Sequence, residues 1–554
     1  MISLYFYVLF PIAVSVILYI FYNKTARILA FVLQAFFVLV SFANLVYVRN
    51  NGQIIEIPGG YSRISGIVLK SDSVSATMVF LCSLLFAVFH LYNFTSTYSS
   101  RLFVMLFFIM QGLVNGVFLS DDIFNIYVMV EASTIVISIL IMFKKDSRSM
   151  YDGMIYLLAN IVAMTFFLFG AGLLYKSFGV LNITYIKQNI ANLDDTKTLL
   201  MPYAFLMTAA GLKSAILPLF SWLPKAHGTP GAPPVVSALL SGLYVKTGLF
   251  IFIRLQEMFS PVIDLKSFFI AAGILTGLAG SFLAICQTDI KLILAYSTIS
   301  QLGLILTGLN SQSPISYWGS IFHVINHSFF KSSLFLSTGI IIEKYGTRDM
   351  RKIRGVSRTM PDIAFASIMA MLGVSGAPLF NGSISKYLIH KGFAGAIAEY
   401  GILIINFATV LYCIRLLSIF FDIDNISFAG NSDCKHENQE HITQTKQCFQ
   451  QIDKYKSTAV MLMAAVCFLG GLTGFYIVDL LFNLKVYIDV WWYLSKVAVY
   501  FATLLIGFFV YLKFIRRSNF INRVRQFDVG FNGICFSIVV FFVITLIAGL
   551  IKYN

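Results

Sequence analysis

Apolar runs of about 20 residues recur along the whole chain, and this feature constrains the fold more than any other. Each run is long enough to cross a bilayer as a helix. Strands of a membrane barrel would alternate polar and apolar residues, and these runs do not. Because 58% of the 554 residues are hydrophobic and only 12% are charged, the sequence predicts an all-α polytopic membrane protein.

About sixteen spans satisfy the length criterion. They run approximately over residues 2–22, 26–48, 74–95, 101–120, 122–143, 152–175, 201–221, 233–255, 266–286, 291–309, 316–342, 361–390, 399–421, 457–482, 490–513 and 530–551. The first run lacks a basic leading region and a small-residue cleavage site, so we expect it to be retained as a span.

Basic residues are distributed unevenly between the loops, and this distribution predicts the orientation. With the N-terminus outside, one side collects Lys24, Arg27, Arg101, Lys144, Lys145, Arg148, Lys225, Lys291, Lys344, Arg348, Arg351, Lys352, Arg354, Arg358, Lys513, Arg516, Arg517, Arg523 and Arg525. The other side has a thinner scatter that includes Arg49, Arg63, Lys70, Lys176 and Lys391. We therefore expect the dense loops to be cytoplasmic and both termini to be outside. Basic cytoplasmic loops also explain the net charge of +15 without a nucleic-acid partner.

The stretch from Gly211 to Arg254 carries the strongest functional signal. Lys213 and Lys246 lie inside otherwise apolar helical runs, and Pro218 interrupts the first of them. A lysine in the hydrocarbon layer is costly unless it faces a partner or water, so it marks a functional site. A proline frees a backbone carbonyl in the same helix. Charge and a broken helix together predict an ion or proton site at membrane depth.

A second broken span repeats this pattern. Pro378-Leu379-Phe380 precedes Lys386, as Pro218-Leu219-Phe220 follows Lys213. Two interrupted helices in corresponding halves, each with a lysine nearby, are typical of inverted-repeat transporters.

Between the two breaks, His323, His327 and Lys331 are spaced four residues apart and form one stripe on a helix. Imidazole changes its charge near neutral pH, so the stripe suits a proton relay. Two histidines at this spacing could also bind a metal, but no carboxylate joins them nearby. A single buried histidine ordinarily forms a hydrogen bond with a neighbouring carbonyl. That role does not explain three titratable side chains in one stripe.

Glu131 lies in the fifth span, about 13 Å beyond Asp122 along the helix axis. An isolated carboxylate at this depth would be protonated. We therefore expect Glu131 to pair with Lys213, so that each holds the other in its charged form.

The connection from Asp422 to Lys456 is the one long polar stretch, and it contains Cys434, His436, His441 and Cys448. We interpret it as a solvated linker, with a zinc site as the alternative, because the spacing fits no standard pattern. The seven cysteines of the chain make no disulfide framework. No nucleotide loop, cofactor motif or catalytic triad is present, so we expect no cofactor and no redox catalysis by this chain alone.

Six blocks in order resemble the antiporter-like subunits of respiratory complex I and their relatives in multisubunit Na+/H+ antiporters and membrane-bound hydrogenases. The blocks are DIFNIYVMVE (Asp122–Glu131), GLKSAILPLFSWLPKAH (Gly211–His227), SALLSGLYVKTGLFIFIR (Ser237–Arg254), TDIKLILAYSTISQLG (Thr288–Gly303), HVINHSFFKSSLF (His323–Phe335) and GAPLFNGSISK (Gly376–Lys386).

The resemblance implies a fold of about fourteen core transmembrane helices with inverted repeats and two broken helices, to which this chain adds a two-helix extension. It implies five regions, namely N-terminal helices (1–100), a first antiporter-like helix repeat (101–255), a second such repeat (256–422), a polar cytoplasmic linker (423–456) and C-terminal helices (457–554). It also implies that ions are moved by Glu131, Lys213, Lys246, His323, His327, Lys331 and Lys386, with Pro218 and Pro378 as hinges of the broken helices.

The function implied is translocation of H+, or exchange of Na+ for H+, by one subunit of a larger complex in a bacterial-type cytoplasmic membrane. The linker between the last two spans is too short for the long lateral helix of the largest complex I member. A stand-alone antiporter complex and a hydrogenase-type complex therefore fit as well as complex I. An autonomous secondary transporter and a structural scaffold are the alternatives, but neither explains so many intramembrane ionisable residues.

Overall fold

The computed structural model describes residues 2–62, 66–193, 195–421, 453–484, 490–516, 518–525 and 528–553. Its helices are α1 (Phe6–Ile20), α2 (Lys24–Asn51), α3 (Ser73–Asn93), α4 (Arg101–Leu119), α5 (Ile123–Ile141), α6 (Ser147–Phe178), α7 (Ile183–Asn189), α8 (Leu200–Lys213), α9 (Trp222–Gly228), α10 (Pro234–Leu239), α11 (Val245–Phe259), α12 (Lys266–Cys286), α13 (Ile290–Leu309), α14 (Pro314–Tyr345), α15 (Val356–Thr359), α16 (Pro361–Ser375), α17 (Asn381–Lys391), α18 (Ile397–Leu417), α20 (Lys454–Leu472), α21 (Gly474–Phe482), α22 (Val490–Val510), α23 (Asn519–Val524) and α24 (Phe531–Tyr553).

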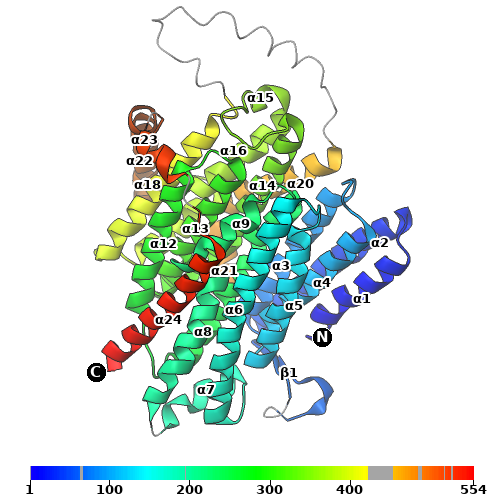
Figure 1. Ribbon diagram of the computed structural model, residues 1–554, viewed down its shortest axis with the longest axis vertical. Helices are drawn as coiled ribbons and strands as arrows, with labels where there is room; N and C mark the ends of the chain where they lie inside the picture. Colours follow the sequence, from blue (N-terminus) through cyan, green and yellow to red (C-terminus); the bar gives the residue numbers. More distant parts are fainter. Residues whose placement is uncertain are drawn as a thin grey trace, which may run out of the picture.

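A helix, or a pair of consecutive helices, lies at each of the sixteen predicted positions. In the described part of the chain, twelve helices are long and apolar enough to cross a membrane, and α1 and α16 are shorter apolar helices. The helices form one bundle in which most of them run side by side (Figure 1). The prediction of an all-α multi-pass membrane protein is therefore confirmed.

Polar side chains mark where several helices begin. Asp72, Asp122, Asp146 and Asp289 each accept a backbone N–H at the start of α3, α5, α6 and α13. Such a cap satisfies one of the donors that have no partner inside the helix. At the other end of α14, Gly346 adopts the left-handed conformation that commonly ends a helix.

One short strand pair interrupts the helical pattern. β1 (Ile54–Glu56) pairs antiparallel with β2 (Leu69–Ser71) in the loop between α2 and α3. Strands of three residues are too short to leave a recognisable pattern in a sequence. The pair lies at the same end of the molecule as α7, whereas α15 lies at the opposite end (Figure 1). Both chain termini are nearer to the α7 end.

Both predicted broken helices are present. α8 ends at Lys213 and α9 begins only at Trp222, with Pro218 between them. α16 ends at Ser375 and α17 begins at Asn381, with Pro378 between them. Each break is wider than the single carbonyl that a proline would free, because several residues leave the helical conformation.

The C-terminal extension contacts both halves of the bundle. α24 packs against α8 and α6, and α22 packs against α18. The ring of Phe542 on α24 packs against that of Phe205 on α8, with centroids 4.6 Å apart and the ring planes tilted by 32°. Phe541 lies against Gly211, where a Cβ atom would meet its ring at 3.2 Å.

Several predictions concern residues outside the described ranges. They include the four candidate zinc ligands Cys434, His436, His441 and Cys448, the linker over residues 422–452, and the basic residues Arg63 and Arg517.

Candidate functional site

The first broken helix places Lys213 at the last turn of α8. Its side chain is 3% exposed. The indole Nε1 of Trp222 donates to the carbonyl oxygen of Leu212 at 2.8 Å, and the hydroxyl of Thr276 accepts the N–H of Leu217 at 2.9 Å. These contacts satisfy backbone groups that the break leaves without helical partners. Side chains of the protein thus stabilise the break, and Lys213 lies at its edge.

Two hydroxyl groups hold the ammonium group of Lys213. Its Nζ donates to Oγ1 of Thr134 at 2.6 Å and to the hydroxyl of Tyr244 at 3.4 Å. The Tyr244 and Thr134 hydroxyls lie 3.1 Å apart. The polar environment of Lys213 is therefore formed by α5 and by the turn before α11.

The expected direct ion pair between Glu131 and Lys213 is not formed. The salt bridges between described residues do not include it, and Oε2 of Glu131 has no hydrogen-bond partner among them. Thr134, three residues further along α5, occupies the position beside the ammonium group instead. Lys213 still lies within electrostatic range of Glu131. The two groups are therefore near each other without being in contact.

Lys246 is fully buried in the first turn of α11, directly after a π-helical turn. Residues Leu240–Tyr244 form a π-helical turn between α10 and α11. The Nζ of Lys246 donates to the carbonyl oxygen of Ser241, which lies in that turn. Single π turns are often found at functional sites, where they leave a carbonyl free to accept from a side chain. Lys331 of α14 lies within electrostatic range of Lys246.

The predicted stripe of His323, His327 and Lys331 lies on the unbroken helix α14, and all three side chains are fully buried. Lys331 donates to the hydroxyl of Ser297 and to the carbonyl oxygen of Leu294 on α13. The rings of His323 and His327 have centroids 6.4 Å apart. Neither ring nitrogen of His327 has a hydrogen-bond partner among the described residues.

His323 connects the stripe to the second broken helix. Its Nδ1 lies 2.8 Å from the hydroxyl of Ser385, and its Nε2 lies 3.1 Å from Oε1 of Gln301. Ser385 immediately precedes Lys386 on α17. Lys386 is 7% exposed, and its Nζ has no hydrogen-bond partner in the described part of the chain. The structure thus brings the stripe and the second broken helix together.

Two further groups adjoin the row on the α15 side of the bundle. His227 of α9 stacks on Phe335 with centroids 4.8 Å apart, and its ring nitrogens have no hydrogen-bond partner among described residues. Lys291, at the start of α13, donates to the carbonyl oxygen of Ala232 at 3.1 Å. Lys291, Lys331 and Lys246 all lie within electrostatic range of His227. Lysine and histidine in membrane helices are the signal that could have identified them.

Five neutral side chains of the site were not predicted from the sequence. Each touches one of the predicted ionisable residues, and they are Thr134, Tyr244, Ser297, Gln301 and Ser385. No sequence signal distinguishes them from the other hydroxyl and amide side chains in these spans. The predicted hinges Pro218 and Pro378 lie in the two breaks.

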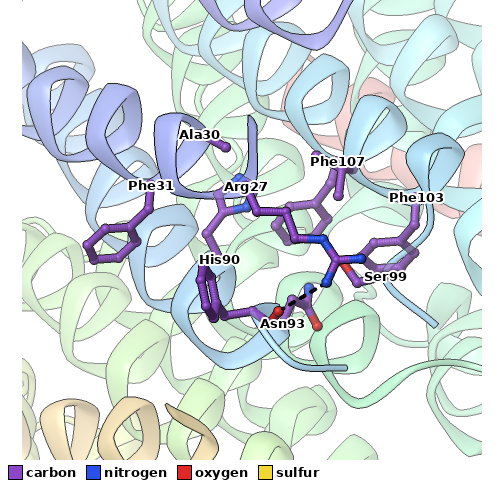
Figure 2. A pocket seen from close by; sticks show the side chains of 10 residues that line it. Arg27, Ala30, Phe31, His90, Asn93, Ser99, Phe103 and Phe107 are labelled. Carbon is purple, nitrogen blue, oxygen red and sulfur yellow. Dashed lines mark hydrogen bonds between the residues drawn. The ribbon is translucent and has the colours of Figure 1, made fainter. Parts of the chain in front are cut away.

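A small separate pocket of about 30 Å³ lies between α2, α3 and α4 (Figure 2). Arg27 donates to the carbonyl oxygen of Phe94 at 3.5 Å, and the ring of His90 lies edge-on to that of Phe107. The volume suits about one water molecule. This pocket does not share a residue with the ionisable row.

The row of ionisable residues can hold and pass protons. Each member carries a titratable group, and Lys213, Lys246, His323 and Lys331 contact hydroxyl, amide or carbonyl groups that can donate or accept hydrogen bonds. Among the described residues, no group of three or more histidine, cysteine, aspartate or glutamate side chains has a spacing suited to a metal ion.

Known proteins share the sequence pattern of this chain. Residues 120–414, more than half of the chain, match the family described as NADH:quinone oxidoreductase/Mrp antiporter, TM. The chain is 28% identical over 442 residues to a Na(+)/H(+) antiporter subunit of Alkalihalophilus pseudofirmus, and the match covers 78% of this chain and 88% of that relative. It is 28% identical over 462 residues to the putative antiporter subunit mnhD2 of Staphylococcus saprophyticus, covering 82% and 88% respectively.

Two solved structures share the fold. A chain of the Mrp complex from Dietzia sp. DQ12-45-1b superposes with a TM-score of 0.77 at 22% identity, over 90% of this chain and 99% of that one. A chain of the membrane-bound sulfane sulfur reductase, an archaeal respiratory membrane complex, gives a TM-score of 0.76 at 21% identity, with the same coverage. The chain belongs to the NADH:quinone oxidoreductase/Mrp antiporter family of membrane proteins.

Proposed function

We propose that this chain is the antiporter-like, ion-translocating subunit of a multisubunit membrane complex, and that it moves protons along its buried ionisable row. The row runs from Glu131 through Lys213, Lys246, Lys331, His327 and His323 to Lys386. The observation that carries the proposal is the burial of six lysine and histidine side chains, four of which contact hydroxyl, amide or carbonyl groups. Burying a cation in a membrane protein costs free energy, so side chains of this kind mark a functional site.

The relatives favour a complex over an autonomous transporter. The matched proteins carry the names of antiporter subunits, and the similar structures are chains of the Mrp complex and of a respiratory membrane complex. We propose that a partner subunit covers α5, where Phe124, Val128, Ile135 and Ile139 form one exposed apolar stripe. Glu131 lies within this stripe and is half-buried. A charge on the partner would therefore act on Glu131 directly.

In this mechanism Glu131 stabilises the charged form of Lys213 through space, with Thr134 and Tyr244 as fixed hydrogen-bond acceptors. When a charge on the partner weakens the electrostatic interaction between Glu131 and Lys213, the ammonium group of Lys213 is less stabilised and gives up its proton. The proton moves along the row toward Lys386, which exchanges with one side of the membrane. The coupled cation is Na+ in the antiporter form of this proposal.

The test compares four variants in membrane vesicles at equal levels of assembled complex. We expect Glu131→Gln and Lys213→Met each to reduce antiport sharply, because each removes one half of a coupled pair. The double variant should be little worse than either single one, since coupled residues are not additive. Lys176→Met removes an exposed lysine from the end of α6 and should leave transport unchanged. Near-normal antiport by both single variants would refute the proposal.

We also propose the orientation, with the Lys344–Arg358 loop cytoplasmic and the termini outside, in a bacterial cytoplasmic membrane. Its support is the concentration of basic residues in alternate loops, which include the loop that carries α15. A cysteine introduced at Thr347, after Cys434 and Cys448 are replaced by serine, should be labelled by an impermeant thiol reagent only in inside-out vesicles. Labelling in intact cells would reverse the orientation.

A further inference from the structure

The helix α22 of the C-terminal extension covers the second broken helix. A cavity of about 150 Å³ lies between α22, α17 and α18. Lys386 and His390 of α17, Asn406 of α18 and Lys496 of α22 line it. The extension is therefore part of the wall around an ionisable residue of the row.

Two tyrosines of α22 hold the break in place. The N–H of Leu379 donates to the hydroxyl of Tyr493 at 3.0 Å, and the hydroxyls of Ser375 and Tyr500 lie 2.7 Å apart. Leu379 has a φ of 69°, a conformation that excludes its backbone from a helix. The broken segment leaves a donor without a helical partner, and the extension supplies the acceptor.

The cavity contains unsatisfied polar groups. The Nζ of Lys386 and Oδ1 of Asn406 have no hydrogen-bond partner among the described residues, although both atoms are buried. Buried polar atoms are nearly always hydrogen-bonded to protein or to water. A cavity of about 150 Å³ has room for several water molecules, and these two atoms lie where such waters would find partners in an otherwise largely apolar lining. The geometry therefore suits a hydrated chamber next to the Lys386 ammonium group.

A histidine and a glutamate lead from the chamber to the surface. His390 lies one turn beyond Lys386, and its Nε2 lies 3.0 Å from Oε1 of Glu399 on α18, a close contact that lacks hydrogen-bond geometry. The other carboxylate oxygen of Glu399 accepts the N–H of Gly395, and the side chain is 24% exposed. The loop over residues 392–396 lies at the end of the bundle opposite the Lys344–Arg358 loop, since one span separates them. The pair thus stands between the cavity and that surface.

We propose that α22 walls an ion-exchange chamber, in which the His390–Glu399 pair passes protons between Lys386 and the solvent at the 392–396 loop. Tyr493 and Tyr500 are positioning residues that keep the broken helix open to this chamber. One proton leaves the Lys386 ammonium group for the chamber, the pair takes one proton from the chamber and releases one to the solvent, and the row then returns one proton to Lys386, so that no net charge accumulates. The proposal rests on the proposed function and assigns its exchange site.

Other charged and titratable groups also face the pair. They are Lys386 and Tyr387 on α17, and Tyr493, Lys496 and Tyr500 on α22. Lys496 lies within electrostatic range of both His390 and Glu399. A variant of the pair must therefore be compared with a variant that removes a neighbouring charge but leaves His390 and Glu399 unchanged.

The functional test uses His390→Gln and Glu399→Gln, with Lys391→Gln as the matched control. We expect the two pair variants to reduce antiport at least 10-fold and to flatten its dependence on the pH at the 392–396 side. Lys391→Gln, next in sequence to His390, should keep both the rate and the pH profile. Tyr500→Phe should lower the rate and leave the pH profile unchanged, because it removes only the hydroxyl group that holds Ser375.

Two further measurements separate this proposal from the proposed function. If Lys386→Met abolishes antiport while both pair variants behave like Lys391→Gln, the exchange route is wrong and the row stands. If Lys386→Met is fully active, the row itself is wrong. Independently of activity, a cysteine at Ser383, which lines the cavity, should react with an impermeant thiol reagent from the 392–396 side. An unreactive cysteine at Ser383 would exclude a hydrated chamber.

Discussion

Replacing Gly248 by alanine should disturb Lys213 without touching its side chain. Gly248 lies on α11 where that helix crosses the end of α8. A Cβ atom at this position would lie 2.4 Å from the carbonyl carbon of Lys213 and 2.6 Å from the N of Ser214. Ordinary contacts begin at about 3.4 Å, so the two backbones must separate by about 1 Å. Inserting an atom into a packed core typically costs about 1–3 kcal/mol.

The same displacement acts on the Lys213 ammonium group. Its hydrogen bond to Thr134 is 2.6 Å long, and a separation of about 1 Å would bring it to the limit of a hydrogen bond. We therefore expect Gly248→Ala to lower the thermal stability of the purified complex and to reduce antiport more than 10-fold. The matched control is Gly172→Ala on α6, where a Cβ atom meets nothing within 4 Å.

The measurements are thermal unfolding in detergent and antiport in vesicles, both at equal levels of assembled complex. Equal stability and equal antiport for the Gly248 and Gly172 variants would show that α11 does not approach the break so closely. A loss of stability with normal antiport would show that the close approach is structural only.

Three further changes follow from single contacts. Thr134→Val removes the shorter of the two hydrogen bonds to Lys213, a loss of about 2 kcal/mol for the charged form, and antiport should fall while Thr134→Ser remains active in the same vesicle assay. Gln301→Leu removes the amide that contacts His323, so proton transfer toward the second broken helix should slow in a pH-jump measurement, and an unchanged rate would count against this step. Asp528→Asn weakens the 2.6 Å contact between Asp528 and Lys225 of α9. Limited proteolysis of the loop between α23 and α24 should then be faster than in the parent protein.

The sequence was sufficient for the fold and for the ionisable members of the row. Lysine and histidine stand out in apolar runs because burying a charge is costly, and the i, i+4 spacing of His323, His327 and Lys331 places them on one face wherever the helix lies. The neutral members were not predictable in this way. Thr134 and Gln301 belong to residue types that are frequent in membrane helices, and only tertiary packing selects them.

Distances between side chains on different spans could not be predicted from the sequence either. Glu131 and Lys213 were expected to pair because neither is stable alone at membrane depth. Helix packing instead places the hydroxyl groups of Thr134 and Tyr244 beside the ammonium group. A one-turn difference in where two helices cross decides between these arrangements, and no pattern along either helix records it.

The π-helical turn at Leu240–Tyr244 has a consequence for how this segment can vary. Such a turn holds one residue more than an α-helical turn, so a deletion within it would rotate the preceding residues against the following ones by about 100°. Tyr244 contacts Lys213 and Lys246 contacts Ser241, and after a deletion these two pairs could not both survive. The shortened helix would remain apolar and long enough to enter the membrane. We therefore expect natural variation here to consist of substitutions, with the number of residues between Pro234 and Lys246 held constant.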